Sequence, residues 1–472
     1  MPRLIEKTYT YFTTVRGMCR SCREIVPARV FFRDGQVWQE SLCPKCKNEA
    51  ALIASDQHWY LSNVLKTMHD HAPLLCSKQP KNGCPHDCGP CTWHASPCQL
   101  PVFSITNDCE LRCPICFTYN RSDSIYYVSL EDMRKTVDWI IAASGRVDLI
   151  NLTGGEPTRH PQLIDILRIC QRPEIGRITM NSNGLRLADD YSLCEQLAEL
   201  GVHVVLSINT FDPIVSKRLH GRDLTDIKQR AVENLDRAGV RMTILNVMIR
   251  GENEDSITGI AELMRKYDNI LSLTVQTMAY TGQGGGHFPR QRHIPVDEAS
   301  RITAAQFGDG LSGRDFFSRP SAHPLCYQLC YLLKDNGKLI PLTKLAPVER
   351  IASLLDESYL LRPANAADFF TGIINDLYAE GKTELLATLR KLVEQIYPAG
   401  MTISGFERQR IAEQAVRTIY VHSHMDEDTF DCSRSMLCPD MVPVEPGRFI
   451  PACTYNLIYR RQDARFFKDQ SL

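Results

Sequence analysis

Residues 100–290 alternate between short apolar segments and longer amphipathic segments, and this alternation limits the folds open to the chain. The apolar, β-branched segments are predicted strands: Leu100–Thr106, Val147–Thr153, Arg177–Asn181, Val202–Ile208, Met242–Ile249 and Leu271–Thr277. The segments between them have helical periodicity: 130–143, 161–171, 188–200, 223–239 and 254–266. Repeated strand–helix units of this length predict an α/β fold whose parallel sheet closes, or nearly closes, into a barrel. In such barrels the functional residues lie on the loops after the carboxyl ends of the strands.

The composition is that of an ordinary globular protein without a strong electrostatic preference. Across 472 residues, 54 lysines and arginines oppose 55 acidic residues, which leaves a formal net charge of -1. This balance does not favour binding to nucleic acid or to an anionic membrane. We find no apolar run long enough to span a bilayer and no signal-peptide core near the N-terminus. We therefore expect a cytoplasmic protein without a transmembrane segment.

Cysteine is the unusual residue, with 19 in the chain, most of them in groups with short spacers. Because nothing indicates export, disulfide bonds are a poor explanation, and an odd number of thiols cannot pair completely. Thiols a few residues apart are instead typical of a shared metal ion or an iron–sulfur cluster.

The group that follows the first predicted strand consists of Cys109, Cys113 and Cys116. Its C-x3-C-x2-C spacing lets one loop bind one face of a [4Fe–4S] cubane and leaves the fourth iron open to a small chelating molecule. The alternative is a structural zinc or four-cysteine cluster that takes another cysteine from elsewhere. The motif resembles that of the radical S-adenosylmethionine (SAM) superfamily. That resemblance implies a partial (β/α)6 barrel with a catalytic [4Fe–4S] cluster on these cysteines, which cleaves SAM to methionine and a 5′-deoxyadenosyl radical.

Polar and glycine residues follow the next three strands. Gly154, Gly155 and Glu156 come after the second strand, where glycines allow the backbone to approach a ligand closely. Asn183, Ser207 and Asn209 end the next two strands and offer short polar side chains, although each could instead cap its own turn. The resemblance implies that all of these residues bind the cofactor, with Glu156 pairing with the ammonium group of SAM.

Two groups of cysteines before the barrel predict additional metal sites. Two Cys-x2-Cys knuckles suit one tetrahedral ion, either zinc or a rubredoxin-like iron: Cys19, Cys22, Cys43 and Cys46. The following connector has enough thiols for an auxiliary [4Fe–4S] cluster: Cys84, Cys88, Cys91 and Cys98, with Cys76 or His94 as alternatives.

The last cysteines predict a second auxiliary cluster, unless they are buried structural thiols. Any four of five would suffice: Cys326, Cys330, Cys432, Cys438 and Cys453. Our prediction for the four ligands is Cys326, Cys330, Cys438 and Cys453.

The order of these groups divides the chain into four predicted parts: a zinc- or rubredoxin-like knuckle domain (1–65), an auxiliary-cluster connector (66–99), the barrel (100–290) and a mixed C-terminal domain with the second auxiliary cluster (291–472). The most specific motifs are Gly83-Cys84-Pro-His-Asp-Cys88-Gly-Pro-Cys91, Leu111-Arg-Cys113-Pro-Ile-Cys116-Phe117 and Pro451-Ala-Cys453-Thr-Tyr-Asn456. With this order, they resemble one branch of the superfamily, that of the class D radical methylases and the archaeal tetraether lipid synthase.

The resemblance to this branch implies formation of a carbon–carbon bond at an unactivated carbon. We expect methyl transfer to a pterin-like or other small substrate, with the coupling of lipid chains or a non-catalytic iron–sulfur electron carrier as alternatives. An external donor such as ferredoxin or flavodoxin would supply electrons. Helices around 351–396 either help to form the long apolar tunnel that lipid coupling needs or simply cover the barrel. A zinc-knuckle protein that binds nucleic acid is disfavoured, since the knuckles lack a basic cluster with interleaved aromatics.

Overall fold

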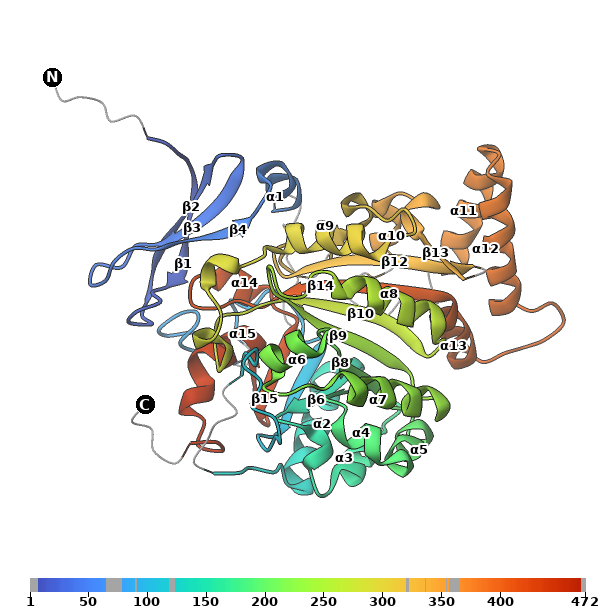
Figure 1. Cartoon of the computed structure of the whole chain (residues 1–472), viewed down its shortest axis with the longest axis horizontal. Coiled ribbons are helices and arrows are strands. Elements are labelled where there is room, and N and C mark those ends of the chain that lie inside the picture. The colour runs from blue at the N-terminus through green and yellow to red at the C-terminus, as the bar shows by residue number, and fades with distance from the viewer. Residues whose placement is uncertain are drawn as a thin grey trace.

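The computed structural model describes residues 7–64, 79–89, 91–118, 124–319, 322–335, 337–353, 355 and 366–467. These residues form a four-stranded sheet near the N-terminus and a 12-stranded sheet that makes up the body of the molecule (Figure 1). Cys76, one of the alternative ligands, lies outside the described residues.

The N-terminal sheet is an antiparallel meander: β1 (Thr10–Met18), β2 (Ile25–Arg33), β3 (Gln36–Ser41) and β4 (Ala50–Ala54), followed by α1 (Gln57–Val64). In the β2–β3 turn, Asp34 and Gly35 both have positive φ, at 53° and 74°, as a two-residue hairpin requires. The β1–β2 and β3–β4 loops lie at the same end of the meander, because successive strands reverse direction. This topology brings the two cysteine knuckles together.

Seven parallel strands form the centre of the large sheet, in the order β14-β10-β9-β8-β7-β6-β5. Six of them have nearly the predicted bounds: β5 (Leu100–Thr106), β6 (Val147–Gly154), β7 (Ile175–Ser182), β8 (His203–Ser207), β9 (Met242–Met248) and β10 (Ile270–Thr277). The intervening helices are α2 (Leu130–Ser144), α3 (Leu163–Cys170), α4 (Leu185–Asp189), α5 (Tyr191–Glu199), α6 (Pro213–His220), α7 (Thr225–Arg237) and α8 (Ser256–Lys266). The predicted α/β fold with a parallel barrel is confirmed.

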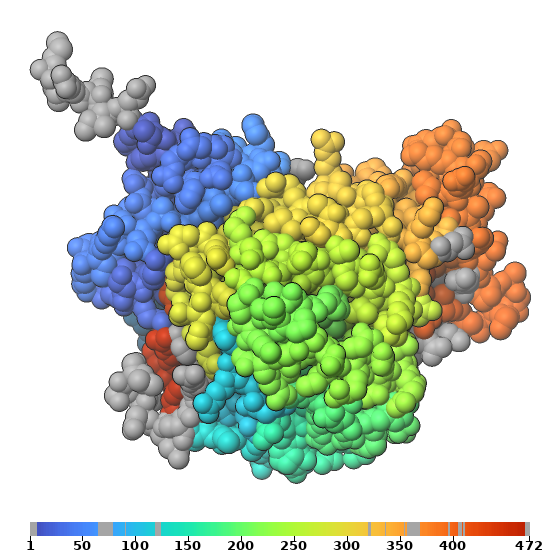
Figure 2. All heavy atoms as spheres, viewed as in Figure 1, coloured from blue at the N-terminus to red at the C-terminus, as the bar shows by residue number. Residues whose placement is uncertain are grey.

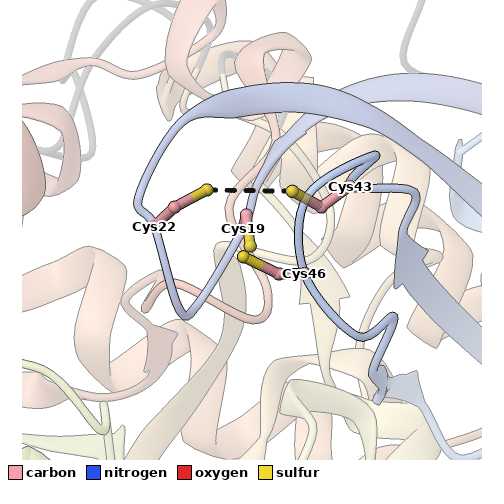
Figure 3. A group of neighbouring side chains, drawn as sticks. All are labelled: Cys19, Cys22, Cys43 and Cys46. Carbon is pink, nitrogen blue, oxygen red and sulfur yellow. Dashed lines mark hydrogen bonds between the residues drawn. The ribbon is translucent and has the colours of Figure 1, made fainter.

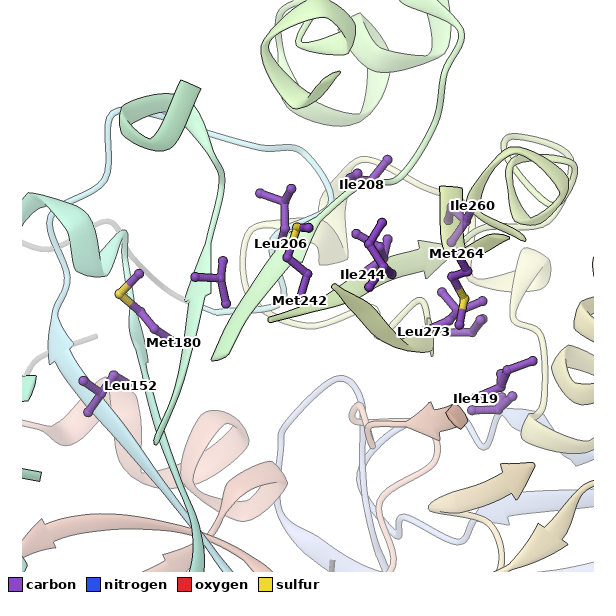
Figure 4. Close-up of a cluster of buried hydrophobic side chains, with 14 of the residues drawn as sticks. Leu152, Met180, Leu206, Ile208, Met242, Ile244, Ile260, Met264, Leu273 and Ile419 are labelled. Carbon is purple, nitrogen blue, oxygen red and sulfur yellow. The ribbon is translucent and has the colours of Figure 1, made fainter. Parts of the chain in front are cut away.

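The main hydrophobic core lies between these strands and the helices outside them. Leu152, Leu206 and Ile244 extend from β6, β8 and β9, and Ile260 and Met264 of α8 pack in the same layer (Figure 4). Each fully buried side chain of this kind stabilises the fold by roughly 1.5–3 kcal/mol. The opposite face of the strands points into the barrel.

Residues beyond the predicted barrel extend the sheet at both edges. At one edge, β14 (Val416–Ser423) pairs in parallel with β10, and the antiparallel strands are β12 (Tyr327–Asp335), β13 (Lys338–Pro341) and β11 (Phe317–Ser318). At the other edge, β15 (Asp440–Glu445) pairs in parallel with β5, and β16 (Arg448–Pro451) follows. The segment predicted as a C-terminal domain therefore contributes directly to the barrel sheet.

The remaining helices are α9 (Val296–Phe307), α10 (Val348–Ser353), α11 (Ala366–Ala379), α12 (Thr383–Ile396), α13 (Gly405–Ala415), α14 (Cys432–Met436) and α15 (Ala452–Thr454). Helices α11 and α12 project at one end of the molecule and the N-terminal sheet at the other (Figures 1 and 2). A second hydrophobic core joins α11 and α12 to β12. Within the described ranges, each helix is too short or too polar to cross a lipid bilayer.

Candidate active site

A cavity of about 540 Å³ lies inside the barrel, and residues from both ends of the parallel strands line it. At the carboxyl ends the wall contains every residue predicted for the catalytic cluster and its cofactor: Cys109, Cys113, Cys116, Gly154, Gly155, Glu156, Asn183, Ser207 and Asn209. The structure therefore brings together residues from four successive strand ends at one place.

The three-cysteine loop follows β5 and is held in place by a second loop. The Cys116 amide donates to the Cys113 carbonyl (3.0 Å), and the Gly284 amide donates to the Cys116 carbonyl (2.8 Å). Burial raises the pKa of Cys109 and of Cys113 to about 12. As free thiols both would stay protonated at neutral pH, so metal binding is what would make them thiolates. Three half-buried thiols that share a cavity are a donor set that fits an iron–sulfur cluster.

Gly154 and Gly155 allow the end of β6 to contact the cysteine loop directly. The Gly155 amide donates to the Thr106 carbonyl and the Glu156 amide to the Asp108 carbonyl, both at 2.7 Å. A Cβ atom on Gly155 would lie 2.2 Å from the Asp108 oxygen, and Gly154 also has a φ of +135°. Neither position can hold a larger residue without displacing the loop that carries Cys109.

The Glu156 carboxylate joins the ends of β6 and β7. It accepts hydrogen bonds from Thr158 Oγ1 (2.7 Å), Ser182 Oγ (3.0 Å) and the Asn183 amide (2.7 Å). Burial raises the pKa of Glu156, while these donors favour its charged form. Its predicted pairing with an ammonium group stays a prediction, because in the structure the carboxylate binds the protein itself.

Asn183 presents an unused donor to the cavity. Its Oδ1 accepts from the Leu185 amide (2.9 Å), whereas its Nδ2 is buried without a hydrogen-bond partner in the described part of the chain. Ser104 Oγ, also on the cavity wall, is buried and unpartnered among the same residues. Buried polar groups are normally hydrogen-bonded, so these two atoms indicate a polar ligand.

Ser207 and Asn209 belong to a connected polar group at the end of β8. Asn209 Nδ2 donates to Ser207 Oγ (3.3 Å) and lies 3.0 Å from His220 Nε2, and its Oδ1 accepts from the Val247 amide (2.6 Å). Asn209 therefore orders the loop after β8, and Ser207 offers a hydroxyl to the cavity.

Lys228 is a site residue that the sequence did not single out. It is 5% exposed, and its Nζ donates to the Asn183 carbonyl (2.5 Å). Burial lowers the pKa of Lys228 to about 8. The signal was present in the sequence, because Lys228 shares the buried face of α7 with Ala231, Val232 and Leu235 at helical spacing. A lysine at such a position indicates a specific partner.

The other end of the cavity lies at the amino ends of the strands and is mainly apolar, although Arg177, Arg408 and Glu413 also line it. Its lining comes mainly from β12, the turn before α10, and helices α11 to α13: Leu333, Leu342, Leu345, Phe369, Phe370, Ile373, Leu389, Leu392 and Ala412. Helices within 351–396, for which the sequence allowed either a tunnel or a cover, thus line one end of the cavity.

The knuckle cysteines form a compact group of four thiols. Their sulfurs all lie within 4.8 Å of one another, and those of Cys22 and Cys43 are 3.7 Å apart (Figure 3). This packing fits a single tetrahedral ion. The group lies in the two loops at one end of the N-terminal sheet, away from the cavity lining.

The other predicted ligands divide differently from the sequence grouping. Cys432 Sγ lies 3.6 Å from the Cys84 carbonyl oxygen, and contact between the two thiols lowers the pKa of Cys84. Burial raises the pKa of Cys88 to about 12, and neighbouring Cys84 and Cys91 add to this. We call these four residues the connector set: Cys84, Cys88, Cys91 and Cys432.

Cys98 lies instead near the late cysteines. Because β15 pairs in parallel with β5, with Asp440 opposite Leu100, the strand direction places Cys98 beside Cys438. Burial raises the pKa of Cys438, and the nearby charges of Asp440, Cys453 and Cys326 raise this pKa further. We call Cys98, Cys326, Cys438 and Cys453 the cavity-side set. The name reflects two neighbours that line the cavity, Asp440 and His424, and His424 also contacts Cys453.

Cys330 does not join either set, and this corrects the sequence grouping. It lies in β12 opposite Ile419 and packs within the main hydrophobic core. The sequence grouped it with Cys326 because of their short spacing, but the strand conformation carries Cys330 along β12 into the core. Cys170 and Cys194 are core residues of α3 and α5.

A parallel barrel with a three-cysteine loop after its first strand and a polar cavity beside it defines the class of radical SAM enzymes. Residues 103–264 match the model described as the radical SAM superfamily. These residues therefore form a radical SAM domain. A [4Fe–4S] cluster and SAM are the cofactors of the class, and the donor set described above fits them.

Among curated proteins, the chain is similar to the 7,8-dihydro-6-hydroxymethylpterin dimethyltransferase of Methanocaldococcus jannaschii, with 23% identity over 485 residues and 94% of each protein covered. It is also 34% identical over 172 residues to the GTP 3′,8-cyclase of Syntrophomonas wolfei, which covers 35% of this chain and 51% of that enzyme. A solved structure of Streptococcus suis SuiB bound to precursor peptide SuiA matches 43% of this chain and 44% of that chain, with 20% identity and a TM-score of 0.38.

Proposed function

We propose that this protein uses radical SAM chemistry to form a carbon–carbon bond at an unactivated carbon, and that the reaction is methyl transfer to a pterin-like or other small substrate. The observation that carries the proposal is the shared cavity of the Cys109 loop, the Gly154-Gly155 strand end and the unpartnered Asn183 donor. Similarity to a dimethyltransferase over 94% of the chain supports methyl transfer.

Each part of the site has a distinct role in this proposal. Cys109, Cys113 and Cys116 would hold a [4Fe–4S] cluster beside the SAM-binding part of the cavity. When bound, the cluster supplies the electron that cleaves the sulfonium bond. The two glycines allow the strand end to contact the loop that carries Cys109, and the Asn183 amide would donate to polar groups of the cofactor. Ser207 would offer its hydroxyl to the cofactor while Asn209 orders the loop beside it, and the surrounding barrel would exclude water.

The other cysteine groups serve electron supply and structure. The connector set and the cavity-side set each provide four thiols for an auxiliary [4Fe–4S] cluster, and the knuckle holds zinc or iron. An external donor such as ferredoxin or flavodoxin in the cytoplasm would deliver electrons to them.

The apolar end of the cavity favours a second candidate, the coupling of lipid chains. A pterin ring is short and polar and has no use for an apolar wall that extends to α11 and α12. A long hydrocarbon chain would fill this end, with its reactive carbon near the cluster.

The first experiment is anaerobic reconstitution of the full chain with iron and sulfide, followed by SAM and dithionite. Release of 5′-deoxyadenosine is expected, and Cys113→Ala should abolish it. A fully iron-loaded protein that releases none would refute radical SAM activity.

Ala412→Phe separates the two candidates, because Ala412 lines the apolar end. Methylation of a reduced pterin should be unaffected by this change, whereas turnover of a long-chain lipid should be lost. Ala387→Phe, on the exposed face of α12, is the matched control and should affect neither reaction.

A further inference from the structure

The two auxiliary cysteine sets differ in the groups that face their sulfurs. In the cavity-side set, Arg434 Nε donates to Cys326 Sγ and the Met425 amide donates to Cys453 Sγ, each at 3.4 Å. His424 Nδ1 also lies 3.4 Å from Cys453 Sγ. In the connector set, the sulfurs of Cys432 and Cys88 donate to the carbonyl oxygens of Cys84 and Pro85, and the Tyr459 hydroxyl interacts with the Cys88 thiol. Two N–H donors and a His424 ring nitrogen therefore contact the sulfurs of Cys326 and Cys453, whereas the Cys438 sulfur donates to the Asp440 carbonyl.

Arg434 is the most informative of these donors because its charge is buried. The residue is 4% exposed, and its Nη2 donates to two carbonyl oxygens, of Leu325 (3.2 Å) and Ser423 (3.0 Å). Among the residues that the structure describes, no carboxylate lies within ion-pair distance of its guanidinium. An arginine is always charged, and a buried charge without a counter-charge is costly.

The sulfur atoms supply the missing counter-charge when they bind metal. Carbonyl oxygens satisfy hydrogen bonds but carry no net charge, and Asp431 acts on Arg434 only at longer range than Cys326. A metal-bound Cys326 is a thiolate, so the contact at 3.4 Å becomes a charge-assisted hydrogen bond. The position of Arg434 thus indicates an anionic cluster at this set.

Hydrogen bonds and positive charge near cluster sulfurs stabilise the reduced form, which carries the more negative charge. The effect is large where the local dielectric is low. At the connector set, Arg16 acts on Cys84 electrostatically, but its side chain is exposed and water screens it. The positive charge of Arg16 therefore has less influence on the reduction potential of the connector set than Arg434 has on that of the cavity-side set.

We propose that Arg434, together with the Met425 amide and His424, gives the cavity-side cluster the higher reduction potential of the two auxiliary clusters. Arg434 is a positioning residue, because it acts through Cys326 and does not contact substrate. The inference rests on the proposed presence of both auxiliary clusters. An electron shared between them then resides beside the cavity rather than beneath the N-terminal sheet.

The test is an anaerobic redox titration of the reconstituted full chain, followed by electron paramagnetic resonance. Arg434→Met, which keeps the length of the side chain and removes its charge, should shift one auxiliary signal to a more negative potential. The other auxiliary signal and the SAM-cleaving cluster should keep their potentials. Cys326→Ser identifies the shifted signal, because it should alter the same one.

Two further variants guard against misfolding and nonspecific effects. His424→Phe removes the nitrogen near Cys453 and retains a ring to stack on Phe117, whose ring centroid lies 4.7 Å away. It should shift the same signal in the same direction by a smaller amount. Arg16→Met, the exposed control, should leave the cavity-side signal unchanged.

Unchanged potentials in both Arg434→Met and His424→Phe would overturn the inference, as would a shift confined to the connector-set signal. Iron content sufficient for one cluster, with only the SAM-cleaving signal, would instead refute the auxiliary clusters themselves. These failures are distinguishable, since the second is seen in the unmodified protein before any variant is made.

Discussion

Replacing Gly155 by alanine tests whether contact between β6 and the cysteine loop is essential. The backbone of Gly155 lies outside the positive-φ region, so alanine is not excluded by conformation. The obstacle is space, because the new Cβ would lie 2.2 Å from the Asp108 oxygen and 2.7 Å from that of Asn107. Ordinary Cβ contacts begin near 3.4 Å, so the loop that leads into Cys109 must move by roughly 1 Å.

The expected effect on activity exceeds the effect on stability. Overpacking of this kind costs about 1–3 kcal/mol in the free energy of unfolding, which a chain of this size tolerates. A misplacement of about 1 Å in a catalytic group can lower a rate about 100-fold. Gly155→Ala should therefore fold and bind iron, yet release 5′-deoxyadenosine about 100-fold more slowly than the unmodified protein.

The assay compares the rate of 5′-deoxyadenosine release per bound cluster with the midpoint of thermal unfolding. Gly286→Ala is the matched control, since its Cβ would meet nothing within 4 Å and its backbone also lies outside the positive-φ region. It should retain the full rate. A normal rate in Gly155→Ala would refute the reasoning, because the cysteine loop would then tolerate displacement without consequence.

Three other changes have defined outcomes. Asn183→Asp keeps the acceptor for the Leu185 amide but replaces the free donor. The Kd for SAM should therefore rise tenfold or more, because a hydrogen bond to a charged group is worth about 1.5–3 kcal/mol. An unchanged Kd in equilibrium dialysis would contradict this. Cys46→Ser should remove the knuckle metal, measured by elemental analysis, while dithionite-driven SAM cleavage persists; loss of cleavage would place the knuckle in the reaction itself. Burial lowers the pKa of His220 from 6.5 to about 4. Between these two pH values the unfolded state binds more protons than the folded state, so the free energy of unfolding falls as the pH falls. His220→Gln should flatten that slope by at most about 1.4 kcal/mol per pH unit in urea titrations, and an unaltered slope would show that His220 is not buried as described.

The sequence predicted local elements well because their signals are local. Strand and helix periodicity within 100–290 predicted six strands and most of the helices between them with nearly correct bounds, although α6 was missed. The strands β14 and β15 were missed, because their place in the sheet depends on pairing with β10 and β5 rather than on their own pattern.

The cysteine groups show the same division. Three cysteines on one loop, and two knuckles joined by one hairpin meander, could be grouped from spacing alone. Cys98 and Cys432 could not, because each lies in space beside cysteines from a distant part of the chain. Spacing along the chain predicts shared ligands only where the intervening backbone stays local.

The separation of Cys84 and Cys432 by 348 positions has a consequence for biogenesis. A ribosome must complete more than nine-tenths of the polypeptide before the connector set can exist as four thiols. The barrel edge formed by β15 is made at the same late stage. Under the proposed function, cluster assembly at the connector set would therefore follow translation, and chains cut short before residue 432 would lack one of its four thiols.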